Sequence, residues 1–128
     1  MELREIKFRG LRKAKNMVGV WEVGNYHKGA FTGCSFINGY EVIPETVGQY
    51  TGLPDINEKE IYEGDVLNCG DRVVYVYWNI YCGTWDSKFI RYTKKPLSSN
   101  GITPNEWKYR AEVIGNIHDN PELLEVIK

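Results

Sequence analysis

The sequence has few of the features that mark disulfide-stapled or metal-binding proteins. Its three cysteines (Cys34, Cys69 and Cys82) are odd in number and contain no C-x-x-C pair, so they cannot complete an intramolecular disulfide framework. The two histidines have no short ligand spacing to the cysteines, which leaves no zinc pattern. We therefore predict no metal and no cofactor, and we interpret the cysteines as small buried hydrophobic side chains.

Long apolar segments are also missing. The longest apolar run, residues 73–78, is far too short to cross a bilayer. Three of the first five residues are charged, and this start lacks the apolar centre of a signal peptide. We therefore expect a soluble, cytoplasmic protein with no membrane partner.

The chain has no excess of one charge: 16 Lys and Arg stand against 17 Asp and Glu, which gives a net charge of -1. No global field is available to hold nucleic acid or an acidic membrane. Residues 1–15 nevertheless carry six bases against two acids, +4, and residues 41–71 carry eight acids against Lys59, -7. These opposed segments indicate either ion pairing within the chain or head-to-tail association between copies.

Helix-forming residues are scarce and strand-forming residues are abundant. The sequence has 11 Val and 11 Ile against 3 Ala and 7 Leu, together with 9 Tyr, 4 Trp and 13 Gly. This composition favours strands joined by tight turns over a helical bundle. A chain of 128 residues is close to the common size of one domain, so we predict a single domain, 1–128.

Alternating apolar residues locate the expected strands. Residues 5–9 and 17–23, joined by a turn at residues 15–16, predict an N-terminal hairpin. Asn38-Gly39 between residues 36–37 and 40–42 is the best hairpin signal in the chain. The densest strand pattern covers residues 72–80, and residues 108–117 predict a last long strand.

One short helix is expected at the C-terminal end. Asp119 or Asn120 can cap it and Pro121 suits its first turn. The predicted fold is therefore all-β, a small barrel-like domain of antiparallel strands with an N-terminal hairpin region (residues 1–45) and a barrel-like region (residues 46–128). The residues expected to shape its turns and corners are Gly48, Gly52, Gly64, Asp65, Gly115 and Pro121.

Several stretches together resemble the YopX family of small phage and prophage proteins. They are residues 4–10, residues 42–53, residues 60–66, and residues 112–117 with 120–124. The resemblance implies a mostly β, barrel-like fold and a phage-encoded protein that acts in the cytoplasm of a bacterial host. It transfers no catalytic residue. Glu58 stands where the family usually has glycine after Asn57, and a tight turn there carries a steric cost at positive φ.

The acidic segments lack the pattern of an active site. Residues 55–60 hint at a calcium loop, but Glu60 stands where glycine is needed and Val66 where the bidentate acid belongs. Glu63 and Asp65 are spaced like an acid pair, although turn-bonding is the ordinary role of such residues. His118 has no positioned Ser or Cys nucleophile near it in the sequence. We predict no catalytic residue and no enzyme.

Two segments are candidate binding surfaces. Gln49, Tyr50 and Thr51 lie between two glycines in a segment without phosphate-loop form, and either line a recognition surface or serve the architecture. Residues 88–95 interleave bases with aromatic rings, as single-strand binders do. The alternative is an exposed strand in which Phe89 and Ile90 pack while the lysines keep the sheet edge soluble. The candidate side chains in this second segment are Lys88, Arg91, Tyr92 and Lys94.

These observations predict a non-enzymatic phage or prophage accessory protein. Its expected partner is a second copy or another protein, so that it acts as a protein-interaction or self-assembling β module. The alternative is a small nucleic-acid-binding β-barrel, for which residues 1–15 and 88–95 supply the bases.

Overall fold

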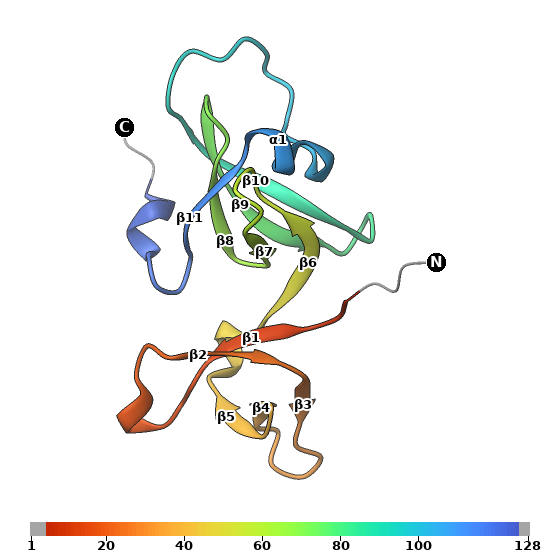
Figure 1. Cartoon of the computed structure of the whole chain (residues 1–128), viewed down its shortest axis with the longest axis vertical. Helices are drawn as coiled ribbons and strands as arrows, with labels where there is room; N and C mark the ends of the chain where they lie inside the picture. The colour runs from red at the N-terminus through yellow and green to blue at the C-terminus, as the bar shows by residue number, and fades with distance from the viewer. Residues whose placement is uncertain (1–4, 126–128) are drawn as a thin grey trace. The chain divides into compact units, whose positions relative to one another are not determined.

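The computed structural model describes residues 5–125 of the chain. Its strands are arranged in three sheets in which each recorded strand pairing is antiparallel, so the predicted mostly β class is confirmed. The chain divides into two compact units, Met1–Gly52 and Leu53–Lys128, which are taken here in turn (Figure 1). The organisation expected from the sequence, one domain with a hairpin region (residues 1–45) and a barrel-like region (residues 46–128), stays a prediction.

The first unit begins with the expected hairpin. Strand β1 (Phe8–Leu11) pairs antiparallel with β2 (Trp21–Gly24), and a 3-10 turn (Lys15–Met17) lies in the connection. β1 also pairs with the start of β6 (Gly48–Pro54). The N-terminal hairpin is therefore confirmed, with a second strand that starts at Trp21, four residues later than its sequence pattern.

A three-stranded sheet completes the first unit. Its order is β3 (Tyr26–Lys28), β4 (Ser35–Ile37) and β5 (Tyr40–Val42). The turn between β4 and β5 is Asn38-Gly39, with φ of 53° and 85°, as a primed hairpin turn requires. Asn38 Nδ2 also donates to the Val23 carbonyl at 2.8 Å, which ties the turn to β2. The strongest hairpin prediction is confirmed.

The interior of the first unit is small. Ile37 and Val42 are fully buried, and a Cβ on Gly10 would lie 3.1 Å from Val42 Cβ. Glycine at this position lets β1 approach β5 closely. A 3-10 turn (Pro44–Thr46) follows β5, and Thr46 Oγ1 accepts from the Leu11 amide at 2.9 Å.

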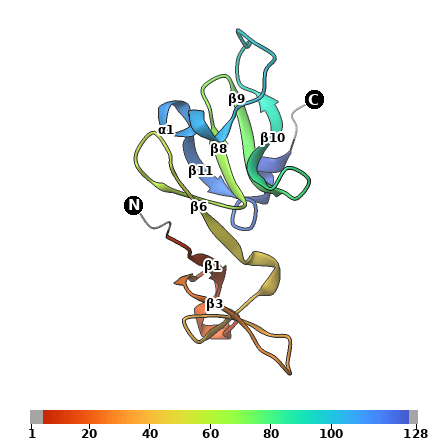
Figure 2. The same ribbon diagram turned by 90° about the vertical axis from the view of Figure 1, so that its right-hand side faces the viewer.

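The second unit contains a four-stranded antiparallel sheet in the order β10-β9-β8-β11. Figure 2 shows the strands of this sheet from a second direction. The strands are β8 (Asp65–Asn68), β9 (Arg72–Asn79), β10 (Thr84–Tyr92) and β11 (Glu112–Asn116), and β7 (Glu60–Tyr62) precedes them. The strand predicted over residues 72–80 is confirmed as β9.

The main core lies in this second unit. Its largest buried cluster gathers side chains from β7 to β10 and from the segment that follows: Ile61, Leu67, Cys69, Val74, Val76, Trp85, Ile102, Trp107 and Ala111. A second cluster contains Val66, Val73 and Ile90. Cys69 is buried as expected, but Cys34 is only partly buried and Cys82 is exposed. The interpretation of Cys82 as a core residue is wrong because it lies in the turn between β9 and β10.

The last long strand is shorter than predicted. Residues 108–110 belong to a short helix, α1 (Trp107–Arg110), which follows a 3-10 turn (Pro104–Glu106). Trp107 is fully buried, and its carbonyl accepts from the Ala111 amide at 2.9 Å. Burial of this indole ring outweighs the alternating pattern that follows it, so β11 begins only at Glu112.

The short C-terminal helix is present as a 3-10 turn, Pro121–Leu124. The expected side-chain cap is wrong, because Asn120 makes no capping hydrogen bond. Its Oδ1 accepts instead from the Asn116 amide at 3.3 Å. Between residues 5 and 125, no helix is long and apolar enough to cross a membrane.

Candidate binding surfaces

Two acids of the central segment, Asp55 and Asp65, accept hydrogen bonds from the backbone of turns. Asp55 is 2 % exposed, and its Oδ1 accepts from the amides of Asn57 and Lys59, each at 2.8 Å. Its Oδ2 accepts from the Val113 amide at 3.0 Å, so one carboxylate joins this turn to β11. Glu58 occupies the turn with a φ of 64°, the strained conformation that its sequence position implied.

Asp65 has a similar place in the next turn. It is 1 % exposed, and its Oδ2 accepts from the Tyr62 amide at 2.7 Å. Gly64 has a φ of 89°, and its amide donates to the Val76 carbonyl at 2.9 Å. The carboxylate therefore bonds the backbone at the corner between β7 and β8, while Glu63 beside it is partly buried.

The other residues expected to shape the fold lie at three separate places. Gly48 pairs with Arg9 of β1, and Gly52 has a φ of 83° within β6. Gly115 packs against Asn120, and Pro121 opens the C-terminal 3-10 turn. His118 lies between these two, and its amide donates to Asn116 Oδ1 at 3.0 Å.

Several charged side chains of the two opposed segments form ion pairs within the chain, and the Lys13–Glu41 pair joins one segment to the other. Arg12 Nη2 lies 2.8 Å from Glu22, and Lys13 Nζ lies 3.2 Å from Glu41. Asp71 contacts two guanidinium groups, those of Arg72 and Arg110, at 3.0 and 2.9 Å. Internal pairing therefore engages bases of the N-terminal segment, as one of the two interpretations expected. Association between copies stays a prediction, and Glu2 and Arg4 lie outside the described residues.

The paired carboxylates are stabilised in their charged form. The hydrogen bond from Arg12 holds the pKa of Glu22 below its usual value, and the bond from Arg72 does the same for the pKa of Asp71. The Arg12 guanidinium also lies 3.6 Å from the centroid of the Tyr40 ring. These cations are fixed by neighbouring side chains.

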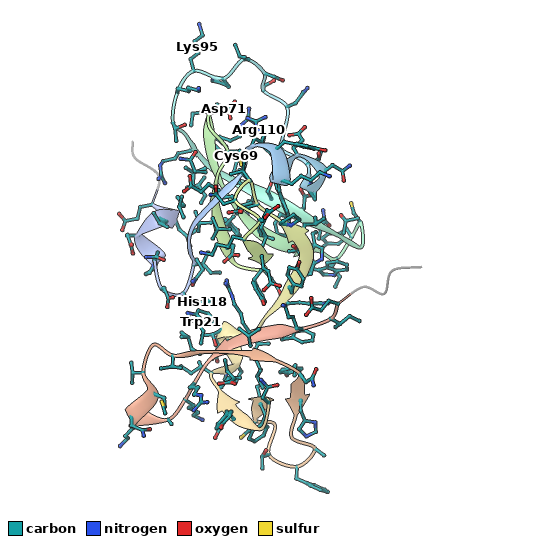
Figure 3. The ribbon with its side chains drawn as sticks, viewed as in Figure 1. Trp21, Cys69, Asp71, Lys95, Arg110 and His118 are labelled. Carbon is teal, nitrogen blue, oxygen red and sulfur yellow. The ribbon has the colours of Figure 1, made fainter. Side chains whose placement is uncertain are left out.

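The first unit carries an aromatic–basic face, defined by Lys7, Arg9, Trp21 and Tyr50. The Arg9 guanidinium lies 4.8 Å from the Trp21 ring centroid, and Lys7 Nζ lies 5.0 Å from the Tyr50 ring centroid. Trp21 projects from β2 (Figure 3). Lys7, just before β1, and Arg9 within it lie on one side because side chains alternate along an extended chain, a pattern visible in the sequence. The contact of Arg9 with Trp21 depends on the pairing of β1 with β2.

The three residues predicted as one recognition surface in β6 point in different directions. Tyr50 belongs to the aromatic–basic face, whereas Gln49 and Thr51 lie on the opposite side because side chains alternate along a strand. Thr51 is 4 % exposed. The structure therefore does not place these three side chains on one surface.

Most of the second predicted set lies in β10, an edge strand of its sheet, and Lys94 follows the end of that strand. Lys88 and Lys94 are exposed, and the rings of Phe89 and Tyr92 lie 4.6 Å apart with about half of each residue exposed. Pairing with β9 shifts between Phe89 and Arg91, which bulges Ile90 inward. The Arg91 side chain is engaged within the chain, because its Nη1 donates to the Leu123 carbonyl at 3.0 Å.

The cysteine and histidine side chains do not come together to form a metal site in the described residues. Within residues 5–125, no group of three or more His, Cys, Asp and Glu side chains is placed to hold a metal ion. Burial raises the pKa of the Cys69 thiol to about 11, so this cysteine stays protonated at neutral pH. It lies below Asp71 and Arg110 in Figure 3.

A groove in the second unit has no counterpart in the predictions. Its cavity volume is about 430 Å³, within the usual range for ligand pockets. It is lined by the end of β6 and by the turn and helix that precede β11: Leu53, Pro54, Pro104, Asn105, Lys108 and Tyr109. Fifty residues of sequence separate its two walls, and no local pattern brings them together.

Comparison with known proteins identifies the family. The family model of the YopX protein matches residues 7–125. The chain belongs to the YopX family. The resemblance seen in the sequence is thereby confirmed over nearly all of the chain.

A solved structure supports the same fold for this YopX protein. The crystal structure of protein EF1440 from Enterococcus faecalis is 23% identical, covers 94% of this chain and 99% of its own, and superposes with a TM-score of 0.55. No curated protein sequence matches the chain.

Proposed function

We propose that this YopX protein is a non-enzymatic accessory protein of a phage or prophage that acts in the cytoplasm of the host. It binds a partner protein or a second copy of itself through the first unit. The family membership and the exposed apolar surface of that unit support this proposal.

One observation carries the proposal. Among described residues 5–52, two hydrophobic side chains are buried and eight large ones are exposed: Ile6, Val18, Val20, Val23, Tyr26, Phe31, Tyr40 and Ile43. Among residues 53–125 the balance is thirteen buried and ten exposed. The described part of the first unit thus keeps more of its large apolar side chains in water than in its interior, and we infer that a partner covers part of this surface.

The exposed side chains have the chemistry of interface anchors. Val18 is 83% exposed and Phe31 is 103% exposed, so each keeps nearly its whole apolar surface in water. Transfer of that surface against a partner is favourable by about 25 cal/mol per Å². Tyr40 beside Arg12 adds the aromatic and arginine pair that interfaces favour.

The test uses the full chain with Val18→Ser and Phe31→Ser combined. Light scattering over a range of protein and salt concentrations measures self-association, and cross-linking in lysogenic cells measures partner capture. We expect the association or the captured species to be lost from this variant. The matched control, Tyr81→Ser with Leu97→Ser, removes equally exposed side chains from the second unit and should retain it. A wild-type monomer with no cross-linked species above the double variant contradicts the proposal.

A second candidate function is supported by the edge of β10. The Phe89 and Tyr92 rings lie in contact and about half exposed, and Lys88 and Lys94, near them in the sequence, are exposed. Exposed rings can stack on bases while cations contact phosphates. Fluorescence polarisation with a labelled single-stranded oligonucleotide tests it. Binding should weaken steeply with salt and with Lys88→Ala and Lys94→Ala combined. Absence of binding at low salt ends this alternative.

A further inference from the structure

The two walls of the groove in the second unit are each attached to the buried core. Trp107 is fully buried in the core and fixes α1, while Lys108 and Tyr109 that follow it are exposed. On the opposite wall, Leu53 packs against the same core cluster. Both walls are therefore anchored by buried apolar contacts, and the groove is preformed.

The groove is lined mainly by apolar side chains, with the polar side chains of Asn105 and Lys108 among them. Pro54 and Pro104 have no backbone N–H to offer. The side-chain donors that line the groove are the Asn105 carboxamide, the Lys108 ammonium and the Tyr109 hydroxyl. A complementary ligand has apolar rings and exposed acceptors, with few donors of its own.

Lys108 gives the groove its charge. Its Nζ lies 4.9 Å from the Tyr109 ring centroid. Across residues 5–125, no carboxylate lies within ion-pair distance of this ammonium. The carboxylate of Glu106, two residues earlier, lies 3.8 Å from the Arg110 guanidinium. The charge at the groove is therefore available to an acidic group of a ligand.

We propose that this groove binds an extended, proline-containing segment of a partner protein that carries an acidic residue. Such a segment in the polyproline II conformation has no internal hydrogen bonds, and its prolines have no N–H groups to leave unsatisfied. Its carbonyls accept from Asn105 and Tyr109, its proline rings pack on Leu53, Pro54 and Pro104, and its carboxylate pairs with Lys108.

This site goes beyond the interaction role proposed for the first unit and does not depend on it. The aromatic side chain supplies the main contact area. Tyr109 is 70% exposed, so much of its side chain is accessible to a proline ring. The ion pair with Lys108 sets the preference for an acidic ligand over a basic one.

Two fluorescein-labelled peptides test the proposal on the full chain. One repeats the unit Pro-Leu-Pro-Glu, and the other replaces each glutamate with lysine. We expect the acidic peptide to bind with saturable anisotropy and to shift the nuclear magnetic resonance signal of the Asn105 side-chain amide. Tyr109→Ala should weaken binding about tenfold, as truncation of an interface anchor does.

Charge reversal supplies the sharper test. Lys108→Glu should weaken the acidic peptide by about fivefold or more and strengthen the lysine peptide, which loss of folding cannot do. Tyr81→Ala removes an exposed tyrosine that does not line the groove and serves as the matched control, with binding unchanged. Equal binding of both peptides to all variants, or no binding, overturns the proposal.

The peptide-binding test of the groove can be distinguished from the association test of the first unit. Val18→Ser with Phe31→Ser leaves the residues of the groove intact and should retain peptide binding. Failure of the peptides to bind therefore removes the groove proposal alone, and loss of self-association or cross-linking in that double variant still supports the first-unit surface.

Discussion

At the scale of single residues, Asp55 and Glu58 show how one turn combines support and strain. Asp55 accepts three backbone hydrogen bonds, two within the turn and one from β11. Glu58 sits in the same turn with a φ of 64°, and its amide donates to the Asp55 carbonyl at 3.1 Å. The carboxylate of Asp55 thus holds a conformation that a side chain at position 58 disfavours.

We expect Glu58→Gly to stabilise the protein by up to about 1 kcal/mol. Relief of the left-handed conformation exceeds the added entropy of the unfolded glycine. Urea unfolding measures the change, and Glu58→Ala, which keeps the strain, is the control. A glycine variant no more stable than the alanine variant contradicts the prediction.

The cysteines should react in order of exposure. Cys82 is exposed in its turn and Cys34 is partly buried, whereas burial raises the pKa of Cys69 to about 11. Mass spectrometry after a timed pulse of a thiol reagent should find Cys82 modified first and Cys69 modified only in denaturant. Rapid modification of Cys69 under native conditions would show that β8 opens readily.

At the scale of elements, one arginine connects the sheet of the second unit to the long segment after β10. Arg72, 4 % exposed at the start of β9, donates to the carbonyls of Ser98 and Asn100 at 2.8 and 2.6 Å. Its remaining bonds go to Asp71, so a buried cation is paired and hydrogen-bonded at once. Asp71 thereby positions Arg72, and Arg72 in turn holds the segment that contains Ser98 and Asn100.

Loss of the Asp71 carboxylate should destabilise the second unit. We expect Asp71→Asn to cost about 3 kcal/mol at neutral pH, because it leaves Arg72 buried with a weaker partner. The folded pKa of Asp71 is lowered by its bond to Arg72, so its contribution is fully present above the unfolded carboxyl pKa of about 3.9. That contribution is lost as the pH falls through the lower folded pKa.

Urea titrations between neutral and strongly acidic pH measure this dependence. The difference in stability between wild type and Asp71→Asn should shrink as the pH falls below about 4. Lys13→Ala, which removes a more exposed ion pair with Glu41, is the control and should change stability by less than about 1 kcal/mol. A wild-type advantage that is constant down to acid pH would contradict the assignment to Asp71.

At the scale of the whole molecule, the two units differ in what they bury. The described part of the first unit has Ile37 and Val42 as its buried hydrophobic side chains, and the second has two buried clusters with two tryptophans in the larger one. Burial of apolar area is the main favourable term in folding. The first unit is therefore the less stable of the two by itself, and a partner that covers its apolar surface would stabilise it.

Native-state hydrogen exchange should resolve this difference. We expect the amides of β4 and β5 to exchange at lower free energies of opening than those of β8 and β9. Val76→Ala should increase exchange in the second unit, while Val42→Ala should increase it in the first. A single opening free energy shared by all strands would show that the chain unfolds as one cooperative body.

The sequence determined the elements in which local chemistry is decisive. Asn38-Gly39 allows a primed turn because both residues accept positive φ, and Gly64-Asp65 combines that freedom with a short acceptor for a nearby amide. The alternating and valine-rich runs placed β1 and β9, and the motifs spread along the chain indicated the YopX family. Each of these signals lies within a few residues of its effect.

The tertiary structure decided what depends on residues far apart in the chain. Burial of Trp107 turned the start of a predicted strand into α1 and placed Lys108 and Tyr109 opposite Pro54. Strand alternation separated Tyr50 from its neighbours and set it beside Lys7. Packing free energy depends on which distant surfaces meet, and the order of residues within one segment does not contain that information.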